Sequence, residues 1–515
     1  MGKGIKKKGK KFKMKRMKKL LGILCAFMLV LGMNVTPALA EGEEETYSIT
    51  IKNSRGGHTY EAYQIFTGDL SGTTLSNVVW GSGVSKAGQT ALGDAATKAE
   101  TIKTEADAKA FAKAVAPYLT TTAGSASTVT DGKYVISGLT AGYYLVKDKD
   151  GSLTGDNDSY TEYIIKVVGN TTATPKSDVP TVQKKLKDIN NSTDDAMTDW
   201  QDSSDHDIGD SVPFQLKATL ADNVSSYTTY KVVFHDTQSK GLTYNNDAKA
   251  YIDGKETNGF AVTATVNADG TTTITVSCDN VKALGAGNSS VITVEYTATL
   301  NENAVLGSAG NPNEVYLEYS NNPNKSGEGN NETGNTPKDV VIVFTYKTVI
   351  SKVTKNPDYD PEVEGSEEYI PLAGAEFTLE KYNKKTDKWE AITVVKNDEG
   401  TTFTFSGLDD GNYRLTETKT PAGYNTVDPI YFTITAEHDV LSDNPALTSL
   451  SGNATTGELT FTPNTTNGSL SADVVNRAGV TLPETGGMGT TLFYVAGAGL
   501  VLVAVVLLIT RKRMN

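Results

Sequence analysis

The chain has 515 residues, with 61 acidic against 48 basic side chains and a formal net charge of −13 at pH 7. Eleven of the basic residues lie near the N-terminus and three near the C-terminus, so the stretch between them carries a charge near −27. Such a surface repels polyanions and excludes nucleic acid as a partner. The sequence contains no zinc-type Cys/His spacing, phosphate loop, dinucleotide fingerprint or nucleophile elbow. We therefore expect no metal, no cofactor and no turnover enzyme.

The N-terminal segment has the composition of a secretory leader. A basic region at 3–19 is followed by a short apolar run at 20–33 and then by small residues ending at Ala40. This order predicts a signal peptide over 1–40. Cys25 is lost with it, so the secreted part keeps only Cys278 and cannot form an internal disulfide. Secreted proteins usually rely on disulfides, so another source of robustness is expected.

The residues after the leader read mainly as β-strands. Runs rich in Thr, Val and Ile, such as 163–168, 272–276 and 291–296, are separated by Gly, Asn and Asp turns. This pattern is typical of β-sandwiches, and about 445 residues suggest three of them. The exception is an Ala- and Lys-rich stretch at 86–118, which predicts one or two helices inserted in the first domain.

Domain boundaries are expected where strand patterns stop and Pro, Thr and Asn gather. The first break is at 169–180, and a less clear one is near 345–347. The predicted organisation is a mainly β protein with three tandem immunoglobulin-like sandwiches, the first with a helical insertion. The expected segments are a leader at 1–40, domains at 41–174, 175–346 and 347–480, and a C-terminal segment at 481–515.

The middle domain opens with two adjacent lysines. Strand alternation places Val182, Lys184 and Leu186 on one face, so Lys184 is predicted to point into the core. Lys185 remains the alternative, because a register slip by one residue exchanges the two faces.

The C-terminal segment combines three features in a fixed order. Thr481-Leu482-Pro483-Glu484-Thr485-Gly486-Gly487 precedes an uncharged apolar stretch at 491–510, which is long enough to span a bilayer as a helix. Three basic residues at 511–513 follow at once, as expected for a cytoplasmic end.

This order resembles the cell-wall sorting signal of Gram-positive surface proteins. The resemblance implies that a sortase recognises Leu482, Pro483, Glu484, Thr485 and Gly486. It would cut between Thr485 and Gly486 and pass the Thr485 acyl group to an amine.

Three segments of the third domain carry a further resemblance. They are Pro371–Leu379, Tyr413–Tyr424, which reads Tyr-Arg-Leu-Thr-Glu-Thr-Lys-Thr-Pro-Ala-Gly-Tyr, and Val474–Asn476. These segments resemble a collagen-adhesin B-type domain, and the resemblance implies that the predicted sandwiches are of the Cna type. Such domains in pilins carry a self-made amide between a lysine and an asparagine. By the motif, Lys352 is the amine, Asn476 the acceptor and Glu417 the catalyst.

These residue types suit that chemistry. Burial disfavours the charge of a lysine, and a neutral amine is a nucleophile. A buried carboxylic acid can stay protonated, polarise the asparagine carbonyl and shuttle protons as ammonia leaves. Holding the groups in contact supplies much of the remaining rate enhancement.

The middle domain resembles the corresponding domain of pilins. Phe234-His235-Asp236-Thr237 is similar to the strand that carries a catalytic acid in those domains. The run from Asn313 to Tyr319 is similar to their last-strand acceptor region. The resemblance implies a Lys184–Asn313 amide with Asp236 as catalyst, with Asn321 as an alternative acceptor. In the first domain Asp148 takes the place of Glu417, but no acceptor appears before Asn170, so no crosslink is expected there.

The linker after the first domain contains Thr174-Pro175-Lys176-Ser177. Shaft pilins carry Tyr-Pro-Lys-Asn at this place, and this chain keeps the Pro-Lys pair. The resemblance makes Lys176 the intersubunit lysine, on a stretch too rich in Pro and Thr to be buried.

Together these features predict the major, or shaft, subunit of a covalently polymerised surface pilus that supports adhesion. A class C pilin sortase would join Thr485 of one subunit to Lys176 of the next, and a housekeeping sortase would attach the fibre to peptidoglycan. The expected partners are these sortases, identical subunits, minor tip and basal pilins, and peptidoglycan. The protein would modify itself without being a turnover enzyme. The alternatives are a monomeric wall-anchored adhesin and a minor basal pilin.

Overall fold

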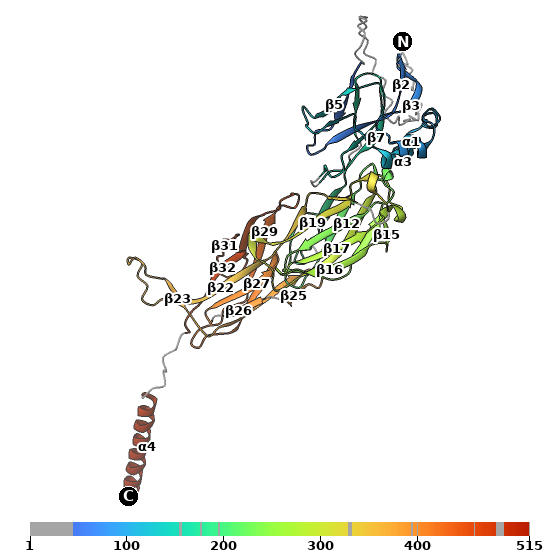
Figure 1. Ribbon diagram of the computed structural model, residues 1–515. Helices are drawn as coiled ribbons and strands as arrows, with labels where there is room; N and C mark the ends of the chain where they lie inside the picture. The colour runs from blue at the N-terminus through green and yellow to red at the C-terminus, as the bar shows by residue number, and fades with distance from the viewer. Residues whose placement is uncertain are drawn as a thin grey trace, which may run out of the picture.

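The computed structural model describes residues 45–153, 157–175, 178–193, 196–327, 332–392, 395–398, 400–457, 459–479 and 489–513. Figure 1 shows three β-rich bodies that follow one another in chain order. We call them domain one (45–173), domain two (181–344) and domain three (346–476). Each consists of two sheets with a hydrophobic core, which confirms the predicted class of tandem β-sandwiches.

Domain one pairs a small sheet of order β5-β1-β8 with a larger one of order β3-β2-β6-β7, in which β4 lies beside β2. Its strands are β1 (Tyr47–Lys52), β2 (Tyr60–Ser71), β3 (Thr74–Trp80), β4 (Gly124–Ala126), β5 (Lys133–Leu139), β6 (Gly142–Asp148), β7 (Glu162–Val167) and β8 (Thr171–Ala173).

The helical insertion has three short helices where one or two were predicted. They are α1 (Lys86–Leu92), α2 (Ala95–Thr101) and α3 (Glu105–Val115), followed by a 3₁₀ turn, η1 (Ala116–Tyr118). Gly93, at φ +87°, ends α1. The side chains of Asp94 and Thr104 then accept backbone hydrogen bonds that cap α2 and α3. These local caps divide what reads as one Ala-rich helical pattern.

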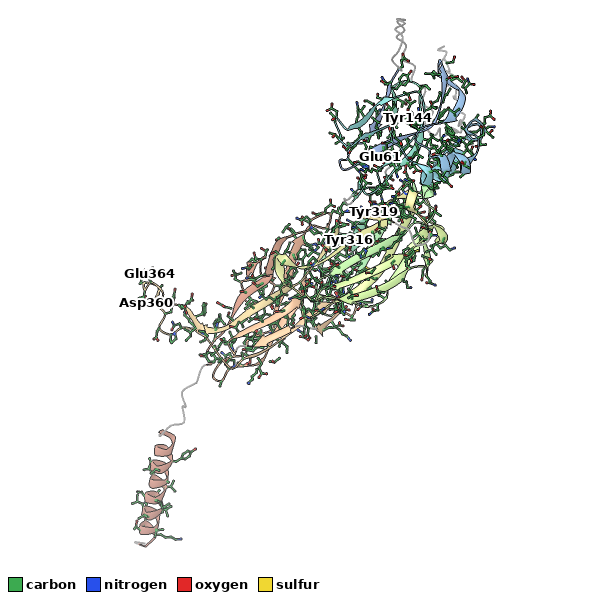
Figure 2. All side chains as sticks on the ribbon, in the orientation of Figure 1. Glu61, Tyr144, Tyr316, Tyr319, Asp360 and Glu364 are labelled. Carbon is green, nitrogen blue, oxygen red and sulfur yellow. The ribbon has the colours of Figure 1, made fainter. Side chains whose placement is uncertain are left out.

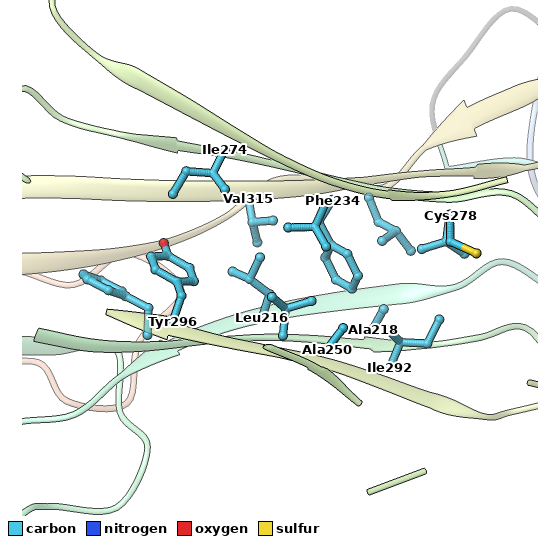
Figure 3. Packing of buried hydrophobic residues seen from close by; sticks show 14 of the residues in the cluster. Leu216, Ala218, Phe234, Ala250, Ile274, Cys278, Ile292, Tyr296 and Val315 are labelled. Carbon is cyan, nitrogen blue, oxygen red and sulfur yellow. The ribbon is translucent and has the colours of Figure 1, made fainter. Parts of the chain in front are cut away.

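Domain two has one sheet of order β15-β14-β18-β11-β9, with β13 beside β18, and a second of order β10-β21-β19-β12-β17-β16, with β20 beside β19. Figure 3 shows aliphatic and aromatic side chains from both sheets meeting in its core. The elements are β9 (Thr181–Leu186), β10 (Ser203–Asp205), β11 (Ser211–Thr219), η2 (Val224–Ser226), β12 (Val232–Gln238), β13 (Leu242–Tyr244), β14 (Lys249–Ile252), β15 (Lys255–Thr257), β16 (Ala261–Val266), β17 (Thr272–Cys278), η3 (Val281–Leu284), β18 (Val291–Leu300), η4 (Gly307–Ala309), β19 (Asn311–Ser320), η5 (Pro323–Lys325), β20 (Thr333–Asn335) and β21 (Asp339–Phe344).

Domain three has one sheet of order β26-β27-β22-β32-β31, with β23 beside β22, and a second of order β25-β24-β28-β29-β30. Its first and last strands, β22 and β32, are parallel neighbours. The strands are β22 (Tyr346–Lys355), β23 (Tyr369–Pro371), β24 (Glu376–Asn383), β25 (Lys388–Ala391), β26 (Val395–Asp398), β27 (Thr402–Leu408), β28 (Gly411–Lys419), β29 (Ile430–His438), β30 (Leu447–Ala454), β31 (Thr462–Asn464) and β32 (Ser469–Asn476).

Hydrogen bonds tie each domain to the next. Tyr319, at the end of domain two that faces domain one (Figure 2), donates through its hydroxyl to the backbone carbonyl of Asp158 at 3.1 Å. Between domains two and three, Ile208 N–H donates to Gly407 O at 3.0 Å. Only Thr345 separates β21 from β22. The domains therefore meet through direct contacts as well as through the chain.

The described C-terminal segment is a single helix, α4 (Gly489–Arg513). Within the described residues it is the one helix long and apolar enough to cross a membrane, over Tyr494–Lys512. This agrees with the apolar stretch expected after the sorting motif.

Candidate crosslinking sites

The site in domain three begins with a lysine on the first strand. Along β22, alternation buries Thr348, Ile350 and Lys352, and the Lys352 side chain is 0% exposed. Because β32 runs parallel beside β22, Asn476 lies within reach of this lysine. Lys352 Nζ donates to Asn476 Oδ1, and to the carbonyl of Val474 at 2.9 Å. The predicted amine and acceptor are therefore in direct contact.

The acid of this site comes from the opposite sheet. Glu417 lies on the buried face of β28, with Oε1 3.0 Å from Asn476 Nδ2 and 3.8 Å from Lys352 Nζ. The backbone N–H of Val427 donates to Glu417 Oε2 at 2.9 Å and fixes the carboxyl group. One acid thus contacts the nitrogen that would leave and lies close to the nitrogen that would attack.

The electrostatics of Lys352 favour reaction. Burial lowers the pKa of Lys352 to about 8, although Glu417 acts in the opposite direction. A larger fraction of the side chain is then the neutral amine at neutral pH than for an exposed lysine. The geometry places this amine against the side-chain amide of Asn476, with an acid beside it.

Domain two contains a second buried trio. Lys184 lies on β9 in one sheet, and Asp236 and Asn313 lie on β12 and β19 in the other, all three 0% exposed. Lys184 Nζ donates to Asp236 Oδ2. Burial lowers the pKa of Lys184 and raises that of Asp236, against their mutual attraction. Burial thus opposes the charged state of each partner, as the chemistry requires.

The alternative residues lie elsewhere. Lys185 points away from the core and pairs with Asp202. Asn321 lies at the junction with domain one, where its carbonyl accepts from Tyr160 N–H at 2.8 Å. The geometry brings Lys184, Asp236 and Asn313 together and not their rivals. Asn313 is not on the last strand of the domain, however, because β20 and β21 follow β19.

Sequence reasoning missed one member of this site. Tyr296 on β18 directs its hydroxyl between the sheets, 3.1 Å from Lys184 Nζ and 3.0 Å from Asp236 Oδ2. Asn313 Nδ2 donates to the same oxygen at 2.8 Å. Alternation along 291–296 places Tyr296 in the core, but it gives no sign that its hydroxyl meets three predicted site residues.

In domain one Asp148, which takes the place of Glu417, has a histidine partner. Asp148 Oδ1 is 2.7 Å from His58 Nδ1, and Asp158 Oδ2 lies 3.1 Å from His58 Nε2. Burial lowers the pKa of His58, but the hydrogen bonds to both aspartates outweigh it and raise the pKa to about 9. The Asn170 side chain is engaged elsewhere, because its Oδ1 accepts from Ser48 N–H at 2.9 Å. The described residues of domain one thus show an ion cluster at this position.

Domain three holds another buried lysine that makes a useful contrast. Lys381 Nζ lies 2.7 Å from Oδ2 of Asp207, which belongs to domain two, and 2.7 Å from Oδ2 of Asp409. Burial lowers the pKa of Lys381, but the two aspartates raise it above the ordinary value. Lys381 therefore stays an ammonium ion in a salt bridge across the domain junction, whereas the pKa values of Lys184 and Lys352 are lowered.

Two predicted sites fall outside the described residues. They are the linker lysine, Lys176, and the sorting motif, Leu482 to Gly486. Between β8 and β9, Pro175 directly before the linker lysine is half-buried, and Thr174 and Asp178 are exposed. Cys278 is buried and is the only free cysteine in the described part of the chain.

Comparison with known families matches three parts of the chain. The Gram-positive pilin backbone subunit 2, Cna-B-like domain, matches 208–323. The prealbumin-like fold domain matches 364–444, and the LPXTG cell wall anchor motif matches 475–515.

Two relatives extend the likeness over most of the chain. The trypsin-resistant surface T6 protein of Streptococcus pyogenes serotype M6 is 26% identical over 443 residues, covering 78% of this chain and 74% of that protein. The solved T6 backbone pilin of serotype M6 Streptococcus pyogenes shares the fold, with a TM-score of 0.54 at 17% identity, over 86% of this chain and 100% of that one.

The anchor motif and the tandem sandwiches define a Gram-positive surface protein that is secreted and held at the cell wall. Within that class, the chain is a sortase-assembled backbone pilin. Its role is that of the shaft subunit of a surface pilus, the first of the three roles considered from the sequence.

Proposed function

We propose that each shaft subunit makes two internal Lys–Asn amides as it folds. The observation that carries this proposal is the contact of Lys352 Nζ with Asn476 Oδ1, while Glu417 holds Asn476 Nδ2 at 3.0 Å. The neutral amine of Lys352 attacks the side-chain carbonyl carbon of Asn476. Glu417 shuttles the proton to the departing nitrogen, and ammonia leaves.

The same chemistry in domain two joins Lys184 to Asn313 with Asp236 as the acid. The two bonds differ in what they bridge. In domain three the amide ties the first strand, β22, to the last strand, β32, within one sheet. In domain two it ties the first strand, β9, to β19 across the two sheets. Pulling force then bypasses most of each domain through covalent bonds, in a protein whose secreted part has one cysteine.

Between subunits, the proposal joins Thr485 of one chain to Lys176 of the next. A pilin-class sortase would hold the Thr485 acyl group as a thioester, and the Lys176 amine would displace it to form an amide. A housekeeping sortase would transfer the base of the fibre to peptidoglycan. The fibre would carry minor pilins and support adhesion. The position of Lys176 in the sequence between two domains, with the exposed residues Thr174 and Asp178 on either side, supports this role.

Peptide mapping of the secreted protein tests the internal bonds. Digestion followed by tandem mass spectrometry should find two branched peptides, one linking Lys352 to Asn476 and one linking Lys184 to Asn313. Lys381 is the internal control, because it is also buried but held as an ammonium ion, and it should appear only in unbranched peptides. Recovery of Lys184 and Lys352 in unbranched peptides, together with unmodified Asn313 and Asn476, would refute the proposal.

A further inference from the structure

The tyrosine at the centre of the domain-two site has contacts that a structural role does not require. One hydroxyl, that of Tyr296, lies within hydrogen-bond distance of all three members of the trio, and the residue is 3% exposed. Figure 3 shows its ring in the core with the hydroxyl directed toward the opposite sheet. The ring packs against Phe214 and Tyr244, at centroid distances of 5.4 and 5.5 Å, which fixes its position.

The two sites differ in the reach of their acids. In domain three both oxygens of Glu417 contact Asn476 Nδ2, at 3.0 and 3.3 Å. Aspartate is one methylene shorter, and Asp236 and Asn313 share no hydrogen bond in the described part of domain two. Asp236 Oδ2 contacts Lys184 and Tyr296, whereas Asp236 Oδ1 and Asn313 Oδ1 have no partner. The Tyr296 hydroxyl fills the gap between the acid and the departing nitrogen.

We propose that Tyr296 is a catalytic residue of the domain-two amide, which relays a proton from Asp236 to the leaving nitrogen of Asn313. This inference rests on the proposed Lys184–Asn313 bond and names the group that completes its chemistry. A hydroxyl suits the role because it can accept one proton while it donates another.

The relay balances in protons and charge. Asp236 first takes a proton from the Lys184 ammonium, and the neutral amine bonds to Cγ of Asn313. Tyr296 gives its proton to Nδ2 as that nitrogen becomes basic, and it takes one from the carboxyl of Asp236. Asp236 then accepts the proton that the former lysine nitrogen must lose. The Cγ–Nδ2 bond breaks, ammonia leaves, and the products are an amide, a neutral Asp236 and an unchanged tyrosine.

Replacing Tyr296 by Phe removes the relay and keeps the ring. In the secreted chain, we expect Tyr296→Phe to slow formation of the Lys184–Asn313 bond by about 100-fold or more. The rate would be followed by tandem mass spectrometry of the branched peptide at intervals after synthesis. The Lys352–Asn476 bond serves as an internal reference and should form at the wild-type rate. Tyr244→Phe is the matched control, because Tyr244 packs on Tyr296 but its hydroxyl accepts from Ala248 N–H, so this variant should form both bonds normally.

The outcomes separate the relay from the bond itself. Equal rates in wild type and Tyr296→Phe would overturn the relay and leave the crosslink intact. Absence of the branched peptide in wild type would overturn the crosslink and, with it, the relay. If protease digestion shows that Tyr296→Phe does not fold, 3-fluorotyrosine at position 296 replaces it, since this side chain keeps the shape but is a stronger acid. The relay predicts that the rate of bond formation changes with the acidity of this hydroxyl, and an unchanged rate would overturn it.

Discussion

Glu417→Gln should leave domain three folded but without its internal amide. Glutamine keeps the size of the side chain and a polar group at Asn476, but it cannot take up and release a proton. General acid–base catalysis contributes about 100-fold or more, so the Lys352–Asn476 bond should form at least that much more slowly. Newly synthesised protein would then keep the side-chain nitrogen of Asn476, which wild type loses as ammonia. Measurement of the intact mass detects this difference.

The stability effect of this change should also be large. The amide closes a loop between residues 124 positions apart. A crosslink over about 100 residues stabilises by about 5 kcal/mol through the lost entropy of the unfolded chain, by analogy with disulfides. The variant also leaves the Lys352 ammonium buried without its acid, which adds to the loss. Denaturant unfolding of domain three measures both effects together.

A matched control comes from the same domain. Glu376 lies on β24 and pairs at the surface with Lys419 at 2.9 Å, and both side chains are more than half exposed. Glu376→Gln should leave the number of ammonia molecules lost unchanged, and it should not change stability measurably, because exposed ion pairs contribute little. A Glu417→Gln chain that forms its amide at the wild-type rate would show that Glu417 is not the catalyst.

Lys176→Ala should abolish pilus polymers and leave single copies attached to the wall. The proposed intersubunit bond needs the side-chain amine of this residue, which alanine lacks. High-mass ladders in detergent-boiled wall extracts, detected by immunoblot, should disappear. The internal amides should persist, since both trios lie in other parts of the chain.

Lys255→Ala is the control for this experiment. Lys255 is an exposed lysine in the β14–β15 hairpin of domain two, so its loss removes a comparable surface amine. Ladders should remain unchanged. Ladders that persist in Lys176→Ala would assign the intersubunit bond to another lysine.

Strand periodicity predicted the fold class and the orientation of the site residues. Lys184 and Lys352 are buried because they occupy inward positions of alternating strands, which can be counted along the sequence. The choice between Lys184 and Lys185 needed the register, since one residue of slip reverses the faces. The three-helix insertion depended on side-chain caps at Asp94 and Thr104, which are weaker signals than the Ala-rich pattern that spans them.

Contacts between strands far apart in the sequence could not be predicted. Nothing near Tyr296 indicates that its hydroxyl meets Asp236 and Asn313, because these residues belong to the opposite sheet. The partner of Asp148 is His58, 90 positions away, so the correspondence of Asp148 with Glu417 predicted the position of the acid but not the ion cluster. The salt bridge of Lys381 likewise depends on Asp207, which belongs to another domain.

The presence of covalent Lys–Asn bonds inside the subunit is tested most directly by the intact mass of the secreted chain, residues 41–485. Each amide releases one ammonia and no water. We expect a mass below that calculated from the sequence by two molecules of ammonia, unchanged by reducing agents. A mass equal to the calculated value would contradict the account in both domains at once.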